Sequence, residues 1–373
     1  MMTSTAFEIQ LVAILVAIAS ALPGVYLVLR RLSLVSDAVS HAVLPGIVIA
    51  FLFVHDLASP LLLVAAGITG LLTVILIEAL QKTALVREDA AIGLVFPALF
   101  SIGVLLIARF ASGVHLDTDA VLLGELAFVP FDRLFWHGLD LGPRAAWSMG
   151  GILLLNASML ALLYKEFNLS TFDATYAAVL GFMPSLLHYL LMAMVSLTTV
   201  GAFHAVGAIL VIALMIAPPA TAYLLTHRVG YMIGLSIGFG FLAAVLGYQV
   251  AQVFDVAIAG AMATMAGVLL VLVWLFAPEE GLVARLRRAR YQRMQFAVDL
   301  LLVHLYRHQY QEKAIDERDV KCLPDHLNWS PERVRQVVAW AQRSGYVRLR
   351  EGRYLELTPI GEKRALQILD MQK

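Results

Sequence analysis

Long apolar stretches, each about the length needed to cross a lipid bilayer, dominate the sequence up to residue 277. A transmembrane helix takes about 20 mainly apolar residues, and 60% of this 373-residue chain is hydrophobic while only 14% is charged. A single broken helix around His204–Gly207 would reduce the count of spans from nine to eight. The sequence therefore predicts an all-α polytopic membrane bundle of eight or nine transmembrane helices. The nine predicted spans are residues 8–29, 36–54, 60–80, 90–110, 146–164, 187–205, 207–226, 230–250 and 256–277.

Basic residues in the connections between spans indicate the orientation, because Lys and Arg are enriched on the cytoplasmic side of membrane proteins. Nine spans place the N-terminus and the loop 111–145 outside and the C-terminal tail in the cytoplasm. Arg109, Arg133 and Arg144 depart from this pattern. The residues that follow it are Arg30, Arg31, Lys82, Arg87, Lys165, Arg228 and the cluster Arg285, Arg287, Arg288, Arg290 and Arg293.

The C-terminal tail differs from the rest of the chain in composition and periodicity. Residues 1–280 carry 9 Lys and Arg against 16 Asp and Glu, whereas residues 281–373 carry 18 against 11. We therefore expect a transmembrane domain over 1–280 and a cytoplasmic α+β domain of winged-helix type over 281–373. The expected elements are helices over Tyr291–His308, Asp316–His326 and Ser330–Ser344, a β-hairpin over Tyr346–Leu357 with its turn at Glu351 and Gly352, and a closing helix from Pro359.

Two ionisable residues, Asp37 and His41, lie inside the second predicted span. A helix places residues four apart on the same face, and ionisable groups within a membrane are costly and are associated with function. Carboxylate oxygen and imidazole nitrogen suit Mn²⁺, Fe²⁺ and Zn²⁺ as ligands. Two ligands are too few for a tight site, but two symmetric subunits would supply four. Alternatively, the two residues pair with each other or cap a neighbouring helix.

Other parts of the chain limit the chemistry it can perform. No Gly-x-x-x-x-Gly-Lys-Ser/Thr phosphate loop occurs, so ATP hydrolysis would have to come from a partner. The single cysteine, Cys322, excludes an intrachain disulfide or a thiolate cage. The outer loop is either an acidic mouth that attracts cations or an ordinary solvated loop. Its acidic and histidine residues are His115, Asp117, Asp119, Glu125, Asp132, His137 and Asp140.

A set of short motifs resembles the permeases of the metal-ion ATP-binding-cassette importers for manganese, zinc and iron. The resemblance begins at Gly24 to Gly46 and includes Asp37 and His41. The matches occur in order and together cover nearly all of residues 8–277. The remaining matches are Arg30 and Arg31 in the first segment, then Arg87, Glu88, Asp89, Ala91 and Gly93, then Asp119–Glu125, then Asp173, Ala177 and Gly181, and then Gly207–Thr221 with Pro218 and Ala222.

The resemblance implies a permease subunit of an ATP-driven importer of divalent transition metals in a bacterial cytoplasmic membrane, and not an enzyme by itself. It implies that Asp37 and His41 coordinate the transported metal, and that Asp173, Ala177 and Gly181 belong to a short helix that docks on the ATPase. The implied partners are the ATPase subunit, an extracytoplasmic metal-binding protein, and a second copy or a related permease. No cofactor is expected to stay bound. The transported ion is expected to be manganese, then zinc or iron.

The residues Leu357–Glu362 resemble the wing-to-helix turn of iron- and manganese-dependent repressors. The basic surface of such a tail suits anionic lipid or an acidic face of the ATPase better than DNA, which would have to be brought to the membrane. We therefore expect a regulatory or docking module. Two other functions stay open from the sequence: a secondary transporter in which Asp37 and His41 relay protons, and a membrane-anchored winged-helix regulator.

Overall fold

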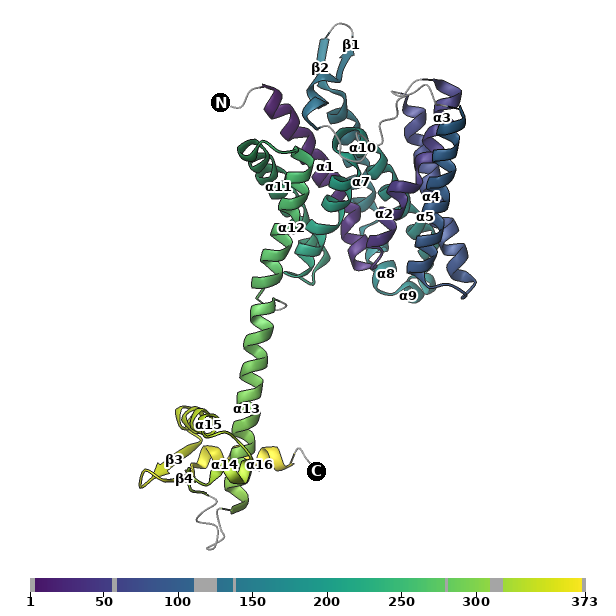
Figure 1. Cartoon of the computed structure of the whole chain (residues 1–373). Helices are drawn as coiled ribbons and strands as arrows, with labels where there is room; N and C mark the ends of the chain where they lie inside the picture. Colours follow the sequence, from purple (N-terminus) through teal and green to yellow (C-terminus); the bar gives the residue numbers. More distant parts are fainter. Residues whose placement is uncertain are drawn as a thin grey trace. The chain divides into compact units, whose positions relative to one another are not determined.

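The chain divides into two compact units, Met1–Gly281 and Leu282–Lys373 (Figure 1). The computed structural model describes residues 4–55, 59–110, 126–136, 139–278, 281–308 and 318–370. Each unit contains its own cluster of buried apolar side chains. The two units are therefore described separately.

The first unit is a helical bundle with a small β-hairpin. Within the described residues, nine helical segments are long and apolar enough to cross a membrane, in agreement with the predicted multi-pass bundle. Its helices are α1 (Ser4–Leu29), α2 (Ser33–Ala42), α3 (Leu44–Val54), α4 (Pro60–Lys82), α5 (Glu88–Phe110), α7 (Arg144–Leu162), α8 (Tyr164–Phe172), α9 (Ala174–Val179), α10 (Pro184–Tyr223), α11 (Val229–Phe254) and α12 (Ile258–Phe276). The 3₁₀ helix η1 (Leu126–Phe131) and the strands β1 (Arg133–Trp136) and β2 (Leu139–Pro143) precede α7.

Helix α1 forms the centre of the bundle and packs against α7, α10 and α11. Its middle is fully buried, including Val16 and Ala17. Small residues allow the helices to approach closely, as is usual in membranes. A Cβ atom on Gly24 would lie 2.1 Å from the carbonyl oxygen of Met215, and one on Gly247 would lie 2.4 Å from the Cα atom of Met262. These glycines are therefore contact points between helices.

Helix α10 supplies two spans, because its 40 residues are interrupted at Gly207, where φ is 77° and ψ is 163°. Pro184, at its start, follows the end of α9 after the short connection 180–183. Towards the other end of α10, Pro219 lies against Gly24, which is near the C-terminal end of α1. The same end of α1 contacts α8 through Arg30. Both ends of α10 thus lie at the same end of the bundle, and the helix turns back at Gly207. The position singled out in the sequence is therefore a break between two candidate spans, and the described residues contain nine such spans.

The second predicted span is also divided. Helix α2 ends at Ala42 and α3 starts at Leu44 after the single residue Val43, with Pro45 in the first turn of α3. Proline lacks the N–H that would continue the hydrogen bonding of α2 and is well suited to a first turn. A Cβ atom on Gly46 would lie 1.9 Å from the hydroxyl of Thr69, so α3 lies closely against α4. Pro45 and Gly46 therefore lie directly after an interruption of this span.

The hairpin β1–β2 and the short helices α8 and α9 lie at opposite ends of the first unit (Figure 1). The N-terminal half of α1 belongs to the hairpin end, because Glu8 contacts Arg133 of β1. The other end of α1 belongs to the α8 end, because Arg30 contacts α8. The candidate site residues can be placed along this axis.

The described residues of the second unit form four helices and one β-hairpin. Its core includes Val298, Leu301, Val337 and Leu355, all fully buried. The strands pair in antiparallel register from Val347↔Leu357 to Arg350↔Tyr354, as the predicted hairpin requires. The elements are α13 (Leu282–His308), α14 (Leu323–Leu327), α15 (Pro331–Arg343), β3 (Val347–Arg350), β4 (Tyr354–Leu357) and α16 (Pro359–Asp370).

The ends of α15 match the sequence signals. The hydroxyl of Ser330 accepts a hydrogen bond from the backbone N–H of Arg333, and Pro331 occupies the first turn. Gly345, just past the helix, has a φ of 74°, a conformation that glycine adopts without strain. A capping serine, a proline in the first turn and a glycine after the last turn are all local signals. The bounds of this helix could therefore be predicted closely from the sequence.

Two predicted helices of the tail have different bounds. Helix α13 starts at Leu282, nearly three turns before Tyr291, because its Arg- and Leu-rich first part also favours a helix. The predicted helix Asp316–His326 is wrong over the described residues 318–322. There Asp319 is fully buried, forms a β-bridge with Tyr354 and accepts a hydrogen bond from the backbone N–H of Lys321. Asp316 lies outside the described residues.

Candidate functional site

Helix α2 carries Asp37 and His41 on one face. The Nε2 atom of His41 lies 3.5 Å from the Oδ1 atom of Asp37, with 27% of the His41 side chain and 50% of the Asp37 side chain exposed. Ser33, one turn earlier, is also partly exposed. The structure therefore brings the two predicted metal ligands together on a polar stripe that ends just before the break at Val43.

The opposite face of α2 is fixed by packing. Val35 and Val39 are buried, and beside them the hydroxyl of Ser36 lies 3.2 Å from the sulfur of Met215 in α10. Helix α2 thus contacts α1, α4, α5 and α10. Because these contacts hold the backbone of α2, the face that carries Asp37 and His41 has a defined direction.

One chain supplies only part of a metal-binding set at this position. Across the described parts of the chain, no group of three or more His, Cys, Asp or Glu side chains is arranged to hold a metal ion. The ring of His41 lies beside Phe96 of α5, with 5.6 Å between the ring centroids. A cation bound between Asp37 and His41 would therefore need further ligands from water or from a second subunit.

The three residues expected at the ATPase docking helix belong to α9 and its ends. The carboxylate of Asp173 caps α9 by accepting a hydrogen bond from the backbone N–H of Tyr176 at 2.8 Å. Ala177 is buried, and Gly181 ends the segment with a φ of 87°. They therefore shape a single helical turn. Around it, large apolar side chains are exposed, namely Phe172, Tyr176, Val179, Leu180 and Met183.

A second polar cluster, centred on Glu78, joins α4 to α10. The phenol of Tyr189 donates to Glu78 at 2.6 Å, and the Nε2 atom of His188 lies 2.7 Å from the other carboxylate oxygen. Lys82 is 3.9 Å from the same carboxylate. Tyr189 lies 111 residues from Glu78 in sequence, so no local spacing could indicate that α4 and α10 are joined here.

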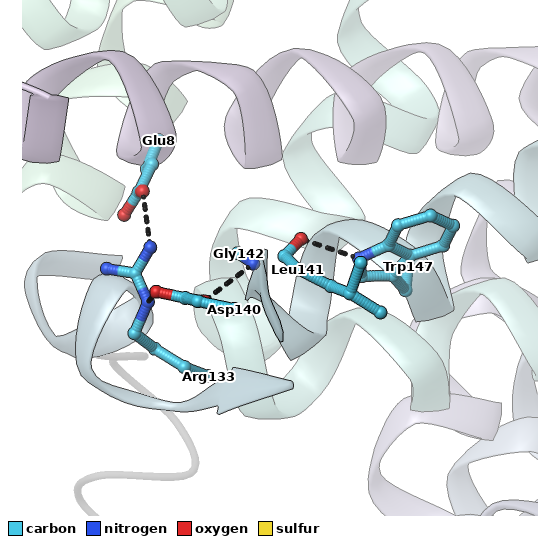
Figure 2. A network of polar contacts seen from close by, with 6 residues as sticks. All are labelled: Glu8, Arg133, Asp140, Leu141, Gly142 and Trp147. Atoms are coloured by element: carbon cyan, nitrogen blue, oxygen red, sulfur yellow. Dashed lines mark hydrogen bonds and ion pairs between the residues drawn. The ribbon is translucent and has the colours of Figure 1, made fainter. Parts of the chain in front are cut away.

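At the other end of the bundle, a polar network fastens the hairpin to α1, as Figure 2 shows. Arg133 bridges Glu8 of α1 at 3.0 Å and Asp140 of β2 at 2.7 Å. The indole N–H of Trp147 donates to the carbonyl of Leu141. The backbone N–H of Gly142 and the Arg133 guanidinium hold the pKa of Asp140 below its ordinary value.

Asp140 is thus a structural residue of the hairpin, and Arg133, which departs from the charge rule, is paired with carboxylates on both sides. Asp132 lies between η1 and β1, where its carbonyl accepts a hydrogen bond from the backbone of Arg144. The other residues of the expected acidic mouth, His115, Asp117, Asp119, Glu125 and His137, lie outside the described residues.

Comparison with known proteins agrees with this architecture. The family model described as the ABC 3 transport family matches residues 2–277. The zinc transport system membrane protein TroD of Treponema pallidum (strain Nichols) is 47% identical over 368 residues, which cover 98% of this chain and 99% of that protein. The manganese transport system membrane protein MntD of Bacillus subtilis (strain 168) is 44% identical over 281 residues, which cover 75% of this chain and 95% of that protein.

A solved structure described as PsaBC from Streptococcus pneumoniae in complex with Fab is also similar. The TM-score is 0.62 at 28% identity, and the match covers 74% of this chain and 94% of the other. The family model spans about three quarters of the sequence, including all nine candidate spans. This multi-pass membrane protein belongs to the ABC 3 transport family.

Proposed function

We propose that the chain is the permease subunit of an ATP-driven importer of divalent transition metals, with manganese as the first candidate and zinc or iron next. The observation that carries this proposal is the Asp37–His41 pair on α2, two metal-ligating side chains in a bundle of this family. The names of the relatives support the substrate class, since one is a zinc and another a manganese transport protein.

The metal path is proposed to form between two subunits, either two copies of this chain or this chain and a related permease. Each subunit would contribute Asp37 and His41. Two oxygen and two nitrogen donors are a set that manganese, iron and zinc all accept. Affinity alone favours zinc over manganese in an open site, so the choice of metal depends on geometry and supply. The transported ion is substrate, and no permanently bound cofactor is proposed.

ATP hydrolysis is assigned to a separate ATPase subunit that docks on α9. The exposed apolar side chains around α9, such as Val179 and Leu180, support this assignment. A surface of this kind fits a groove on a soluble partner. Asp173, Ala177 and Gly181 give the docking helix its shape, so we expect them to affect coupling through the geometry of α9.

The hairpin end of the bundle is proposed to face outward and to receive metal from an extracytoplasmic binding protein. The α8 and α9 end and the second unit would then face the cytoplasm of a bacterial cell. This orientation follows the distribution of Arg and Lys, with Arg30 and Lys165 at the α9 end. Arg133 does not count against it, because it is paired with Glu8 and Asp140.

We assign the second unit the role of a winged-helix-like regulatory or docking module. The order of α13, α14, α15, the hairpin β3–β4 and α16 supports it. The hydroxyl of Thr358 donates to the carbonyl of Gly345 at 2.6 Å and accepts from the backbone N–H of Gly361. The wing and the closing helix are thereby joined. The arginines at the start of α13 suit anionic lipid headgroups, and DNA is the less favoured partner.

Metal accumulation in cells tests the site. Elemental analysis of cells with the wild-type chain, with Asp37→Ala and with His41→Ala should show loss of manganese, zinc or iron uptake in both variants, because each removes one ligand type from both subunits. Asp325→Ala and His227→Ala remove the same side-chain types from exposed positions outside α2 and should keep uptake. Unchanged uptake in both α2 variants would defeat the assignment.

The two other functions considered from the sequence have less support. Membership of the ABC 3 family favours coupling to ATP over a proton-coupled secondary transporter in which Asp37 and His41 relay protons. The match of relatives described as transport system membrane proteins likewise favours transport over a membrane-anchored regulator. Uptake that survives loss of the ATPase but stops when the proton gradient collapses would reverse the first choice.

A further inference from the structure

The end of α1 is fastened to α8 by side chains far apart in sequence. The guanidinium of Arg30 donates from Nε to the hydroxyl of Thr171 at 3.0 Å and from Nη2 to the hydroxyl of Ser170 at 3.3 Å. One turn earlier, the phenol of Tyr26 donates to the side-chain oxygen of Asn168 at 3.0 Å. Arg30 is half-buried, and burial lowers its pKa from the ordinary value, while the Tyr26 phenol acts in the opposite direction.

Apolar packing makes this attachment firm. Tyr26 and Phe167 are both fully buried, and their rings lie 5.4 Å apart between centroids. Ser170 is also buried. Because side chains in a close-packed contact of this kind cannot shift independently, the end of α1 and helix α8 are expected to move together.

The same end of α1 leads directly into the helix that carries the metal ligands. Only three residues separate α1 from α2, and the backbone N–H of Leu32 donates back to the carbonyl of Leu27. Arg31 has a φ of 61°, so the connection is a tight turn. Asp37 and His41 then follow within α2. A displacement of Arg30 is therefore passed to these two ligands through a short and well-bonded segment.

On its other side, α8 leads into α9. The single residue Asp173 separates the two helices and caps α9. Helix α9 is exposed apart from Ala177. A partner that shifts α9 would thus also shift α8, since no flexible linker lies between them. Arg30 therefore connects the two regions. Its side chain contacts Ser170 and Thr171 of α8, next to the docking helix α9, and its backbone leads into α2.

We propose that Arg30 is a positioning residue that carries movement of the docking segment, Tyr164–Val179, to the helix that holds Asp37 and His41. The inference rests on the proposed function. The guanidinium suits this role because its planar set of donors binds two hydroxyls at once, whereas a lysine ammonium is a single point of charge. Metal binding and ATP hydrolysis would each be possible without Arg30, but the link between them would be weak.

The test uses the whole importer, with ATPase and binding protein, in liposomes, and measures manganese transported per ATP hydrolysed. In Arg30→Gln and Thr171→Val we expect this ratio to fall about fivefold or more, the lower end of typical couplings between sites, while ATP hydrolysis continues. Arg30→Lys should restore part of the ratio. The double variant should be no worse than Arg30→Gln alone, because both changes break the same contact.

Arg228→Gln is the matched control, since it removes an exposed arginine that caps α11, and its ratio should equal that of the wild type. A wild-type ratio in Arg30→Gln, or equal losses of hydrolysis and transport in both Arg30→Gln and Thr171→Val, would overturn the role of Arg30 while leaving the proposed function standing. A wild-type importer that moves metal without hydrolysing ATP would overturn the proposed function, and this inference with it.

Discussion

At the scale of single residues, three carboxylates of this chain differ in their partners and in their exposure to solvent. Asp37 pairs with a histidine one turn away, and half of its side chain is exposed. Glu78 instead binds Tyr189 and His188 on another helix, and 24% of its side chain is exposed. Asp319 is fully buried and pairs with Arg353. The partly exposed Asp37 and His41 pair is accessible to a ligand, whereas Glu78 and Asp319 join different elements of the structure.

Asp319 is expected to make the stability of the second unit depend on pH. Burial alone would raise its pKa, but the backbone N–H of Lys321 and the guanidinium of Arg353 outweigh it and hold the pKa below the ordinary 3.8. The stability that ionised Asp319 adds to the folded second unit is therefore fully present above pH 3.8. It is lost as the pH falls through the lower pKa of Asp319 in the folded state. Asp319→Asn should cost about 1–3 kcal/mol near neutral pH, the scale of hydrogen bonds to charged groups.

Amide exchange in the full-length protein measures this effect. Protection of β3 and β4 should fall in Asp319→Asn at pH 7, and the difference from the wild type should narrow in acid. Asp325→Asn is the control, because Asp325 is exposed in α14. Equal protection in wild type and Asp319→Asn at pH 7 would show that the pair contributes nothing measurable.

Residue contacts within one helix could be predicted from the sequence, and contacts between helices could not. Helical geometry alone places His41 beside Asp37, and the metal-ligand hypothesis needed no knowledge of packing. The contacts of Arg30 with Thr171 and of Tyr189 with Glu78 span 141 and 111 residues. They depend on which helices become neighbours, and apolar spans of similar composition carry little information about that choice.

At the scale of elements, the breaks in the helices organise the bundle. The break at Val43 separates α2, which carries Asp37 and His41, from α3, and the break at Gly207 turns α10 back along the bundle. Pro45 and Gly46 follow the first break, and a glycine occupies the second. The direction of the chain after Gly207 became clear only from the contact of Pro219 with Gly24, because a sequence pattern does not describe backbone angles.

Gly207 should be sensitive to any side chain. Its φ of 77° and ψ of 163° lie in a region that is essentially restricted to glycine, and forcing another residue there costs about 1–3 kcal/mol. We expect Gly207→Ala to lower the melting temperature of the detergent-solubilised protein. Gly234→Ala in α11 is the matched control, because a Cβ atom there meets nothing within 4 Å. If both variants melt like the wild type, the break does not depend on glycine.

At the scale of the whole molecule, some matches to known proteins cover only the membrane bundle, and others also cover the tail. The family model ends at residue 277. The match to the Bacillus relative covers 95% of that protein but only 75% of this chain. The match to the Treponema relative covers 98% of this chain and 99% of that protein. The two units also have separate cores, with a boundary at Gly281. A permease bundle of this family can thus occur with or without a tail of this size.

Removal of the tail should therefore leave transport in place. A chain that ends at Gly281 keeps α1 to α12, including Asp37, His41 and the proposed docking helix α9, and its core loses no side chain of its own cluster. We expect metal uptake per copy close to that of the full chain, measured by elemental analysis together with the amount of protein in the membrane. Asp37→Ala in the shortened chain should abolish uptake, which confirms that the same site is in use. If the shortened chain reaches the membrane in normal amount but takes up no metal, the tail is part of the transport machinery and not a separate module.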